Sequence, residues 1–297
     1  MKSCEEKYHP KAVYTDYKEM LKNPDIDAVV VVVSDQLHRQ MAVAALESGK
    51  HVLCEKPMAL SVQDCRAMVD AERRTGKKLM VGQICRYTPG FIAAKKLVED
   101  GTIGELFYVE SEYAHDYSKI AGVDNWRCTP ERHPYLGGGC HAVDLLRWIA
   151  GNPTEVFAYA NHKMLPGWPI DDCTISVMQF PNNVIGKVFV SVGCKRDYTM
   201  RTVLYGSKGT VICDNTSPNL TLYQVTEDKD EFTKPQLIPI EINNHNTFGE
   251  LDEFADLIIH DLPVKTTGYE GASTVAACLA AVESAKIHAP VKISYDF

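Results

Sequence analysis

A run of six apolar residues, Ala28 to Val33 (AVVVVV), constrains the fold of this chain more than any other feature of its sequence. β-branched residues favour extended strands, and a strand that is apolar on both faces belongs in a parallel sheet with helices on each side. The run is also far shorter than the roughly 20 residues that a membrane-spanning helix needs. We therefore expect an α/β fold without a transmembrane segment.

The segments around this run alternate between helical and extended patterns. Helical spacing of apolar residues and short apolar runs follow one another over brief connections. The expected helices cover residues 14–23, 37–48, 61–76 and 90–100, and the expected strands cover residues 27–34, 51–54 and 78–84. Two successive strand-helix-strand units of this kind are typical of a doubly wound parallel sheet.

The pattern changes after Gly104, where longer strands are joined by turns. Strands are expected at 173–180, 184–193, 201–206 and 210–214, and helices at 141–150, 247–260 and 268–288. This part should be an α+β domain with an open, mainly antiparallel sheet, and the final run 291–293 is a candidate for its edge. We place the boundary here, which gives domains of residues 1–104 and 105–297.

Charge and cysteine usage exclude several classes of protein. The chain has 31 Lys and Arg against 39 Asp and Glu, a net charge of −8, which is the wrong sign for neutralising nucleic-acid phosphates. Its ten cysteines include no C-x-x-C pair, so neither a disulfide framework nor a zinc site is indicated. The amino terminus lacks the apolar stretch of a secretory signal. We expect a cytoplasmic protein that binds no nucleic acid, membrane or metal.

Four local patterns occur in a fixed order along the chain. They are GKHVLCEKPMAL at 49–60, VGQICRYTPGFIAAKKLVEDGTIGE at 81–105, NWR at 125–127 and GGGCHAVDLLRWIAG at 137–151. Together they resemble the glucose-fructose oxidoreductase and inositol dehydrogenase family, Gfo/Idh/MocA. The resemblance implies a partial Rossmann-like domain and an NAD- or NADP-dependent oxidoreductase. Its reaction would be hydride transfer at a CH–OH group of a sugar, cyclitol or related polyol. The resemblance also implies a homodimer or homotetramer.

Two residues match the family's catalytic positions. Lys56 matches the catalytic lysine, at the carboxyl end of a strand, and Pro57 would help to aim it. A lysine exchanges protons near neutral pH only if burial or a nearby charge lowers its pKa. His141 matches the active-site histidine, and Asp144, one helical turn later, either orients it or has a structural role. Without the resemblance, a solvated lysine and a core histidine would be the better interpretations.

The resemblance implies further contacts on both sides of the reaction. The residues matched to the cofactor side are Ser34, Asp35, His38, Glu55, Lys56, Pro57 and Arg86. The substrate side comprises Lys56, Tyr117, Asn125, Trp126, Arg127 and His141. For Arg86 an ion pair between the domains is an equal alternative, and for Trp126 and Arg127 so is a packed indole beside a surface arginine.

The sequence departs from the family pattern at two places. Gly137 stands where many members carry an aspartate, so proton exchange would rest on Lys56 with His141, or on a group such as Tyr117. The sequence also contains no G-x-G-x-x-G, the turn that binds the pyrophosphate of a dinucleotide. We interpret residues 1–17 as the end of a second helix followed by a short third strand.

Two explanations of the missing turn compete. In the first, the sequence begins at an internal methionine of an enzyme, about 50 residues after its start. In the second, the short form is a catalytically inactive sugar-binding or oligomerising module whose sheet edge is covered by a partner chain. Without the preceding strands AVVVVV lies at a sheet edge, which is exposed unless a partner chain covers it, and both explanations predict weak binding of NAD(P). A metal-dependent lyase or hydrolase using His115, Asp116, His133 and His141 is disfavoured, because these residues have no recognised ligand spacing.

Overall fold

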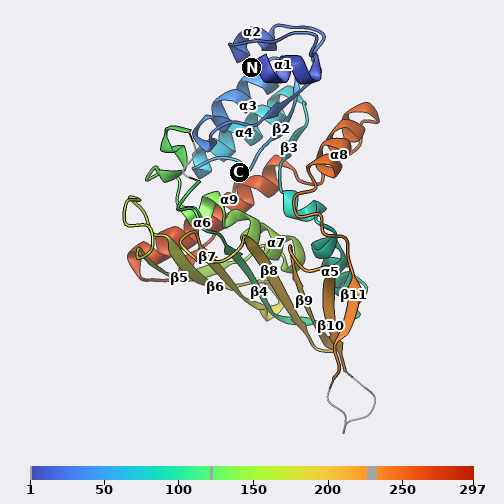
Figure 1. Ribbon diagram of the computed structural model, residues 1–297, viewed down its shortest axis with the longest axis vertical. Helices are drawn as coiled ribbons and strands as arrows, with labels where there is room; N and C mark the ends of the chain where they lie inside the picture. The colour runs from blue at the N-terminus through green and yellow to red at the C-terminus, as the bar shows by residue number, and fades with distance from the viewer. Residues whose placement is uncertain (1, 121–122, 226–232) are drawn as a thin grey trace.

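The computed structural model describes residues 2–120, 123–225 and 233–297. Two sheets follow one another along the long axis of the molecule, with helices between and beside them (Figure 1). The upper sheet has three strands, and the lower sheet has nine. We call them the small sheet and the large sheet. This arrangement confirms the expected fold, a doubly wound α/β region followed by an α+β region.

The small sheet is parallel throughout and has the order β1-β2-β3. Its strands are β1 (Ala28–Val31), β2 (His51–Cys54) and β3 (Leu79–Val81). The connecting helices are α3 (His38–Glu47) and α4 (Val62–Thr75), and α4 begins at Ser61, whose hydroxyl accepts a hydrogen bond from the Asp64 N–H. The strand-helix-strand units predicted from the sequence are therefore confirmed, with strands shorter than expected.

The amino-terminal residues form two short helices. They are α1 (Lys2–Tyr8) and α2 (Tyr17–Leu21), and Asp16 caps the second through the Lys18 N–H. The expectation of a short third strand within residues 1–17 is wrong, because no strand is formed there in the described part, residues 2–17. In a doubly wound sheet the third strand pairs only with the second. Since the described residues include no such neighbour, the segment has no ladder to join.

One long edge of the small sheet is open. β1 pairs only with β2 among the described strands, and Val30 is 43% and Val32 68% exposed. An apolar groove runs along this edge between β1, α2 and α3, lined by Tyr17, Met20, Leu21, residues 29–33, Met41 and Ala45. The expected exposed apolar edge is therefore confirmed.

The large sheet has the order β11-β10-β9-β8-β4-β7-β6-β5-β12. Its only parallel pair within the described residues is β4 with β7, and β12 returns to the edge beside β5, as predicted for the final run. The strands are β4 (Leu106–Ala114), β5 (Glu155–Asn161), β6 (Cys173–Gln179), β7 (Ile185–Ser191), β8 (Thr199–Gly206), β9 (Gly209–Asp214), β10 (Asn219–Gln224), β11 (Gln236–Pro239) and β12 (Val291–Lys292).

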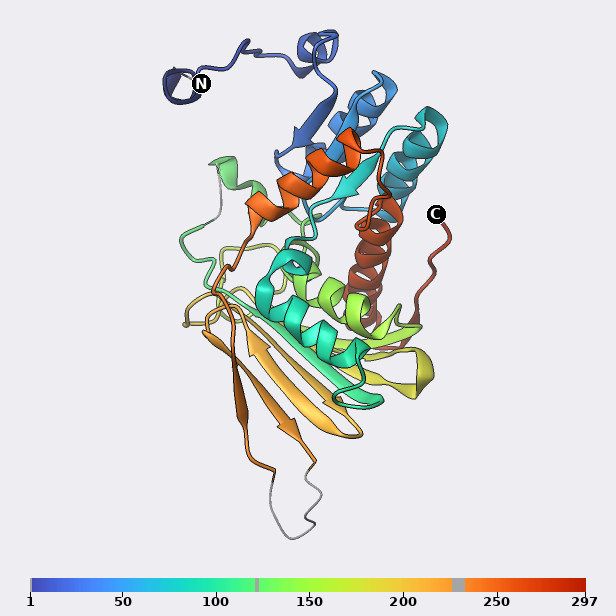
Figure 2. The same ribbon diagram turned by 90° about the vertical axis from the view of Figure 1, so that its right-hand side faces the viewer.

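Helices cover one face of the large sheet and leave the other open (Figure 2). The covering helices are α5 (Pro89–Glu99), α6 (Pro134–Gly137), α7 (Cys140–Ala150) and α9 (Gly268–Ile287). Strand β6 shows the consequence, because Ser176 and Met178 are buried while Ile175 and Val177, which alternate with them, are exposed. The alternation is that of a sheet with one face packed on the core.

The carboxyl-terminal segment ties the two sheets together. The Val81 N–H at the end of β3 donates a 2.8 Å hydrogen bond to the carbonyl of Thr266, and α9 then packs on both α4 and β5. Helix α8 (Thr247–Ile259) covers the other face of the small sheet through Phe254 and Leu257. Across the described ranges, no helix is long and apolar enough to cross a membrane.

Candidate active site in the cleft between the sheets

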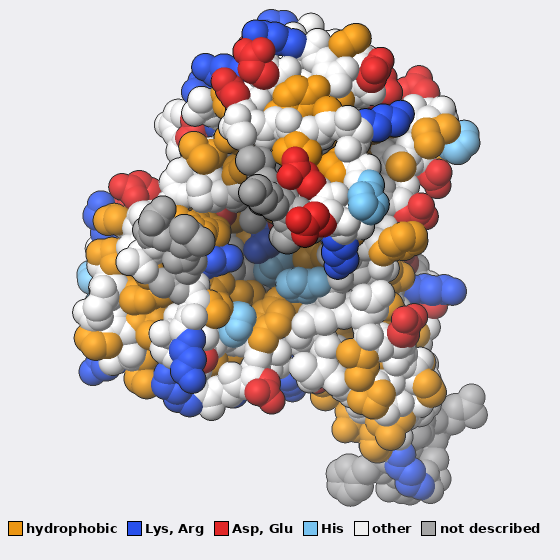
Figure 3. Space-filling model, turned by 45° about the horizontal axis from the view of Figure 1, so that its top comes forward, with side chains coloured by type: hydrophobic (Ala, Val, Ile, Leu, Met, Phe, Trp, Pro, Cys, Tyr) orange, Lys and Arg blue, Asp and Glu red, His pale blue; other side chains and the backbone are white. Residues whose placement is uncertain are grey.

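A cleft of about 450 Å³ opens where the small sheet meets the large sheet. Figure 3 looks toward it and shows histidine and basic side chains at the bottom of a hollow. Of the sequence-predicted site residues, the cleft is lined by Asp35, His38, Glu55, Lys56, Tyr117, Trp126, Arg127 and His141. Four others, Ser34, Pro57, Arg86 and Asn125, do not line it.

The small sheet contributes the carboxyl ends of β1 and β2, the edge where parallel sheets hold ligands. Glu55 and Lys56 follow β2 directly, and the Lys56 N–H donates to Glu55 Oε2 at 3.1 Å. The buried His38 links the two strand ends, because its Nδ1 lies 2.9 Å from the Pro57 carbonyl oxygen and its Nε2 3.2 Å from that of Val33. His38 and Pro57 therefore hold the loop that carries Lys56.

The ammonium group of Lys56 is stabilised in its charged form. Burial lowers the pKa of Lys56, but Cys140, Tyr117 and Glu55 raise it, and the result is a pKa above the ordinary value. The sequence argument required a pKa lowered toward neutrality, and the electrostatics of the cleft are the opposite. The physical reason is that the nearby acidic groups outweigh both desolvation and the repulsion from Arg132.

His141 enters the cleft from the first turn of α7, on the side of the large sheet. Burial, Lys56 and His245 all lower the pKa of His141 well below its usual range, so its imidazole is neutral at pH 7. Its Nδ1 lies 3.4 Å from the Sγ of Cys85, whose own pKa is raised by burial. The Cys85 thiol also lies 3.4 Å from Met200 Sδ, so its single proton has two acceptors. In the tautomer where the thiol donates to Nδ1, the proton of the ring is on Nε2.

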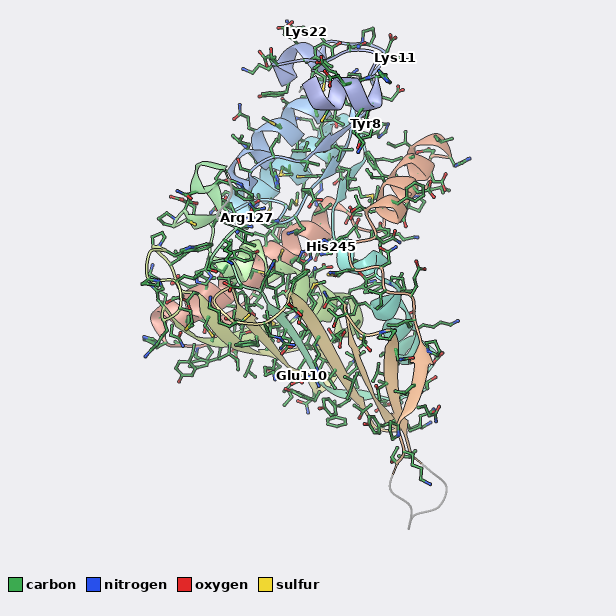
Figure 4. The ribbon with its side chains drawn as sticks, viewed as in Figure 1. Tyr8, Lys11, Lys22, Glu110, Arg127 and His245 are labelled. Carbon is green, nitrogen blue, oxygen red and sulfur yellow. The ribbon has the colours of Figure 1, made fainter. Side chains whose placement is uncertain are left out.

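An aromatic wall closes the cleft on the large-sheet side, and of its tyrosines only Tyr117 was expected from the sequence. Tyr113 and Tyr117 share a 2.8 Å hydrogen bond between their hydroxyls, and Tyr198 and His245 share one of 3.1 Å. The wall also includes His115, whose ring centroid lies 4.7 Å from that of Tyr198. In Figure 4, His245 and Arg127 lie at the level where the two sheets meet. Tyr113 lies on β4 and Tyr198 directly precedes β8, the strand that pairs with β4.

The NWR segment forms the outer rim of the cleft. The guanidinium of Arg127 lies 4.2 Å and that of Arg132 4.8 Å from the ring centroid of Trp126, so one indole packs against two cations. Asn125 is exposed and has a φ of +56°, which places it in the turn instead of the cleft lining. The predicted alternative, a packed tryptophan beside a surface arginine, describes the contact of Trp126 with Arg127. It does not include the second cation, Arg132, or the place of Trp126 in the cleft lining.

Arg132 occupies the space beside Gly137. Its Nε donates a 2.6 Å hydrogen bond to Asp35 Oδ2, and both side chains are buried. A Cβ atom at Gly137 would lie only 2.4 Å from Arg132 Nη1. The position at which the family pattern departs is therefore filled by a guanidinium that reaches in from five residues earlier in the chain.

Arg86 does not reach the cleft. Its guanidinium donates to Asp144 at 2.7 and 2.8 Å and to Glu270 at 2.7 Å, and Asp144 also accepts a 2.9 Å hydrogen bond from Thr274. The ion-pair alternative for Arg86 describes this geometry. Asp144 likewise pairs with arginines and makes no hydrogen bond to His141 within the described part of the chain.

Glu250, on α8, lies behind the Lys56 loop. It is 2% exposed, and its Oε1 lies 3.6 Å from where a Cβ of Gly82 would be, beside the Glu55 backbone. Burial, Glu55 and Glu253 raise the pKa of Glu250 to about 8. Its carboxyl group is therefore largely protonated at neutral pH. Nothing in the local sequence signals this, because α8 reads as an ordinary amphipathic helix.

The candidate metal residues do not converge. Within residues 2–120, 123–225 and 233–297, no group of three or more His, Cys, Asp or Glu side chains is arranged to hold an ion. His133 shows why, since its Nδ1 accepts the Tyr135 N–H as a helix cap and its Nε2 lies 4.0 Å from Asp171. This geometry gives no support to the metal-dependent alternative.

Comparison with known proteins places the chain in a family context. A sequence model described as an oxidoreductase family with an NAD-binding Rossmann fold (GFO/IDH/MocA) matches residues 1–83. A second, the GFO/IDH/MocA C-terminal domain, matches residues 91–212. Together they account for more than half of the chain.

Individual relatives agree with these matches. An uncharacterized oxidoreductase, YrbE, of Bacillus subtilis (strain 168) is 28% identical over 306 residues, which span 99% of this chain and 86% of the relative. The myo-inositol 2-dehydrogenase of Thermotoga maritima is 25% identical over 304 residues, spanning 99% and 87%. A structure of levoglucosan dehydrogenase with NADH and L-sorbose has a TM-score of 0.89 at 22% identity, spanning 99% of this chain and 86% of that one. This last likeness is one of fold.

Proposed function

Because the chain belongs to the Gfo/Idh/MocA oxidoreductase family, we propose that its central cleft oxidises a CH–OH group of a sugar, cyclitol or related polyol with NAD or NADP. The observation that carries the proposal is the meeting of Lys56 and His141 in one cleft of about 450 Å³. Lys56 follows β2 of the small sheet and His141 lies on α7, which covers the large sheet, and 85 positions separate them in the sequence. The inositol dehydrogenase among the relatives supports a polyol as the substrate class.

The residues present fit the nicotinamide end of the cofactor. The carboxyl ends of β1 and β2 open into the cleft, and Asp35, His38, Glu55 and Lys56 line it there. Ser34 and Pro57 belong to the loops that carry these residues. The sequence has no G-x-G-x-x-G, so the described residues offer no glycine-rich turn for the pyrophosphate. Weak binding of the dinucleotide remains a prediction.

Lys56 would hold and move the hydroxyl proton. NAD(P) supplies the hydride acceptor when bound, so the protein's task is to position the substrate and exchange a proton. Since its pKa is raised, Lys56 is charged at neutral pH and acts as the acid when a carbonyl is reduced. In the direction of oxidation, the neutral amine must accept the hydroxyl proton. We therefore expect oxidation to accelerate as the pH rises.

His141 would orient the same oxygen. In the tautomer that accepts the Cys85 thiol proton at Nδ1, the neutral imidazole presents Nε2–H as a hydrogen-bond donor. Tyr117, Trp126 and Arg127 form the opposite rim, where a hydroxyl, an indole face and a guanidinium suit a polyhydroxylated ligand. Asn125 would take part only if its turn closed over the ligand.

The open face of the large sheet is the proposed surface of a homo-oligomer, a dimer or tetramer. It carries exposed apolar side chains on adjacent strands, including Tyr159, Ile175, Val177 and Ile185. Such a band on one sheet face marks an association surface. We also propose a cytoplasmic location, which agrees with ten free cysteines.

Initial rates test the proposed reaction directly. The protein is assayed with NAD⁺ and NADP⁺ against cyclitols and aldoses, and we expect Lys56-dependent formation of reduced cofactor with at least one polyol. Lys208→Met is the matched control, because Lys208 is an exposed residue between β8 and β9. If no polyol supports turnover, or if Lys56→Met is as active as Lys208→Met, the proposed function is wrong.

A further inference from the structure

The cleft carries a positive charge in a protein that is acidic overall. The chain has a net charge of −8, yet the cleft lining contains Lys56, Arg127 and Arg132 against Asp35 and Glu55. Of the four histidines of the lining, His115, His141 and His245 add little charge at pH 7, since burial lowers the pKa of each. The cleft therefore favours an anionic ligand.

Arg132 differs from the other buried arginines in what its guanidinium contacts. Arg86 donates from Nε and Nη2 to Asp144 and from Nη2 to Glu270. Arg147 donates to Asn152 from Nε and Nη2 and to Thr274 from Nη1. Arg132, 3% exposed, donates only from Nε to Asp35 among the described residues, and its buried Nη1 has no partner there. Buried donors without partners are rare in native proteins.

The local backbone holds this guanidinium in place. Gly137 leaves a space that Arg132 fills, with Nη1, Cζ and Nη2 at 2.4 to 2.7 Å from the position of a Cβ. Asp35 fixes Nε from one side, and Trp126 packs at 4.8 Å. The guanidinium is thus fixed in orientation while part of its hydrogen-bonding fork stays unused. A fork of this kind matches a carboxylate.

We propose that the substrate of this cleft carries a carboxylate, as in a uronic or aldonic acid, and that Arg132 binds it. The inference rests on the proposed function and narrows its substrate class from polyols in general to acidic ones. Arg132 acts as a specificity residue, while Lys56 and His141 serve the hydroxyl that reacts. Asp35 and Gly137 act through Arg132 as positioning residues.

The test compares D-glucuronate with D-glucose, which differ at one carbon. Binding to the full chain is measured by calorimetry at low salt, without nucleotide. A charge-assisted hydrogen bond predicts about tenfold tighter binding of glucuronate, or more. Arg132→Gln should abolish this preference, whereas Arg196→Gln, on the open sheet face beside Glu112, should keep it.

A second variant guards against misfolding caused by an unpaired Asp35. Gly137→Ala keeps every charge but forces the Arg132 guanidinium to move, and Gly137 lies in α6, where alanine is compatible with the backbone. We expect it to lose the preference for glucuronate. Gly167→Ala, whose Cβ would contact nothing within 4 Å, is the matched control and should keep the preference.

Four results would overturn the inference. The first is equal binding of glucuronate and glucose by the unsubstituted chain, which leaves the proposed function on neutral polyols intact. The second is a preference that survives in both Arg132→Gln and Gly137→Ala. The third is weaker binding of NADH to Arg132→Gln with glucuronate binding unchanged, which would assign the guanidinium to a cofactor phosphate. The last is no binding of either sugar at millimolar concentration, together with turnover of a neutral polyol in the rate assay.

Discussion

The small sheet and the large sheet differ in how far their own strands and adjoining helices stabilise them. The small sheet has strands of three or four residues, and its β1 edge exposes Val30. The large sheet has strands of up to nine residues and one face covered by helices. Yet the small sheet carries Lys56. The comparison teaches that the amine proposed to exchange the proton comes from the region with the smaller core. The larger region supplies the aromatic wall of the cleft.

The small sheet is stabilised by contacts with later parts of the chain. Helix α8, the bond from Val81 to Thr266 and the packing of α4 on α9 all come from the carboxyl-terminal part of the chain. The cleft therefore exists only when both regions are folded and docked. The predictions below separate the contributions of the two regions, starting with the largest effect.

Replacing Lys56 should have the largest effect. A positioned acid or base contributes roughly 10²–10⁴-fold to the rate, so Lys56→Met should lower kcat for polyol oxidation by that factor. The rate of the unsubstituted chain should increase with pH up to the alkaline range, because the pKa of Lys56 lies above its ordinary value and only the neutral amine accepts a proton. A flat pH profile with Lys56 present would contradict the assignment.

Breaking the buried ion pairs around Asp144 should lower the free energy of unfolding more than the other substitutions do. Asp144 is fully buried and accepts two hydrogen bonds from Arg86. Breaking a buried pair by removing one partner costs about 3–5 kcal/mol. Asp144→Asn should therefore lower the free energy of unfolding by that amount, as measured by urea denaturation. Asp70→Asn, an exposed residue 3.7 Å from Arg73, is the control and should cost less than about 1 kcal/mol. Equal losses in the two variants would show that the buried ion pairs contribute no more to stability than an exposed one.

Glu250 should make the free energy of unfolding depend on pH between 4.5 and about 8. The pKa of Glu250 is raised from 4.5 to about 8 in the folded protein. Between these values the folded chain keeps a proton that the unfolded chain has released, so unfolding becomes easier by about 1.4 kcal/mol per pH unit. This stabilisation is complete below pH 4.5 and is lost as the pH rises to 8.

The variant Glu250→Gln has no proton to lose. We expect its free energy of unfolding to fall less steeply across this range than that of the unsubstituted chain, with a relative gain at pH 8. Glu99→Gln, on the exposed end of α5, should follow the unsubstituted chain. Parallel curves for all three proteins would show that Glu250 ionises normally.

Substitutions on the two exposed apolar surfaces should have the smallest effect on the stability of the fold. Val30→Lys on the small-sheet edge should change stability by about 0.5 kcal/mol or less and leave the oligomer intact. Val177→Lys, on the open face of the large sheet, should dissociate the proposed oligomer into monomers in sedimentation experiments. The reverse result would move the association surface from the large sheet to the edge of β1.

Sequence reasoning recovered the elements whose signals are local. The strand in the run at 28–33, the helix after Ser61 and the final strand all depend on neighbouring residues, and they lie where they were expected. The third strand failed because a strand needs a partner, and its local pattern says nothing about one. Lys56 and His141 were located through a resemblance, and the structure brings both to one cleft.

The rest of the site depends on tertiary structure. Tyr113 on β4 and Tyr198 just before β8 are far apart in the sequence, and only the pairing of β4 with β8 brings them together. Arg132 belongs to no motif, and only the missing side chain at Gly137 hinted that something else must fill that space. The pKa of Lys56 likewise depends on Cys140 and Tyr117, which lie 84 and 61 positions away in the sequence.

The most direct test of the central claim is quenching of tryptophan fluorescence by NADH. Trp126 lines the cleft, whereas Trp148 lies at the end of α7 beside Arg86 and Lys95. If the nicotinamide binds between the two sheets, NADH should quench the emission saturably, even at millimolar concentration. Trp126→Phe should then lose most of the quenching and Trp148→Phe should keep it. Saturable quenching that disappears with Trp148 and survives without Trp126 would contradict the account.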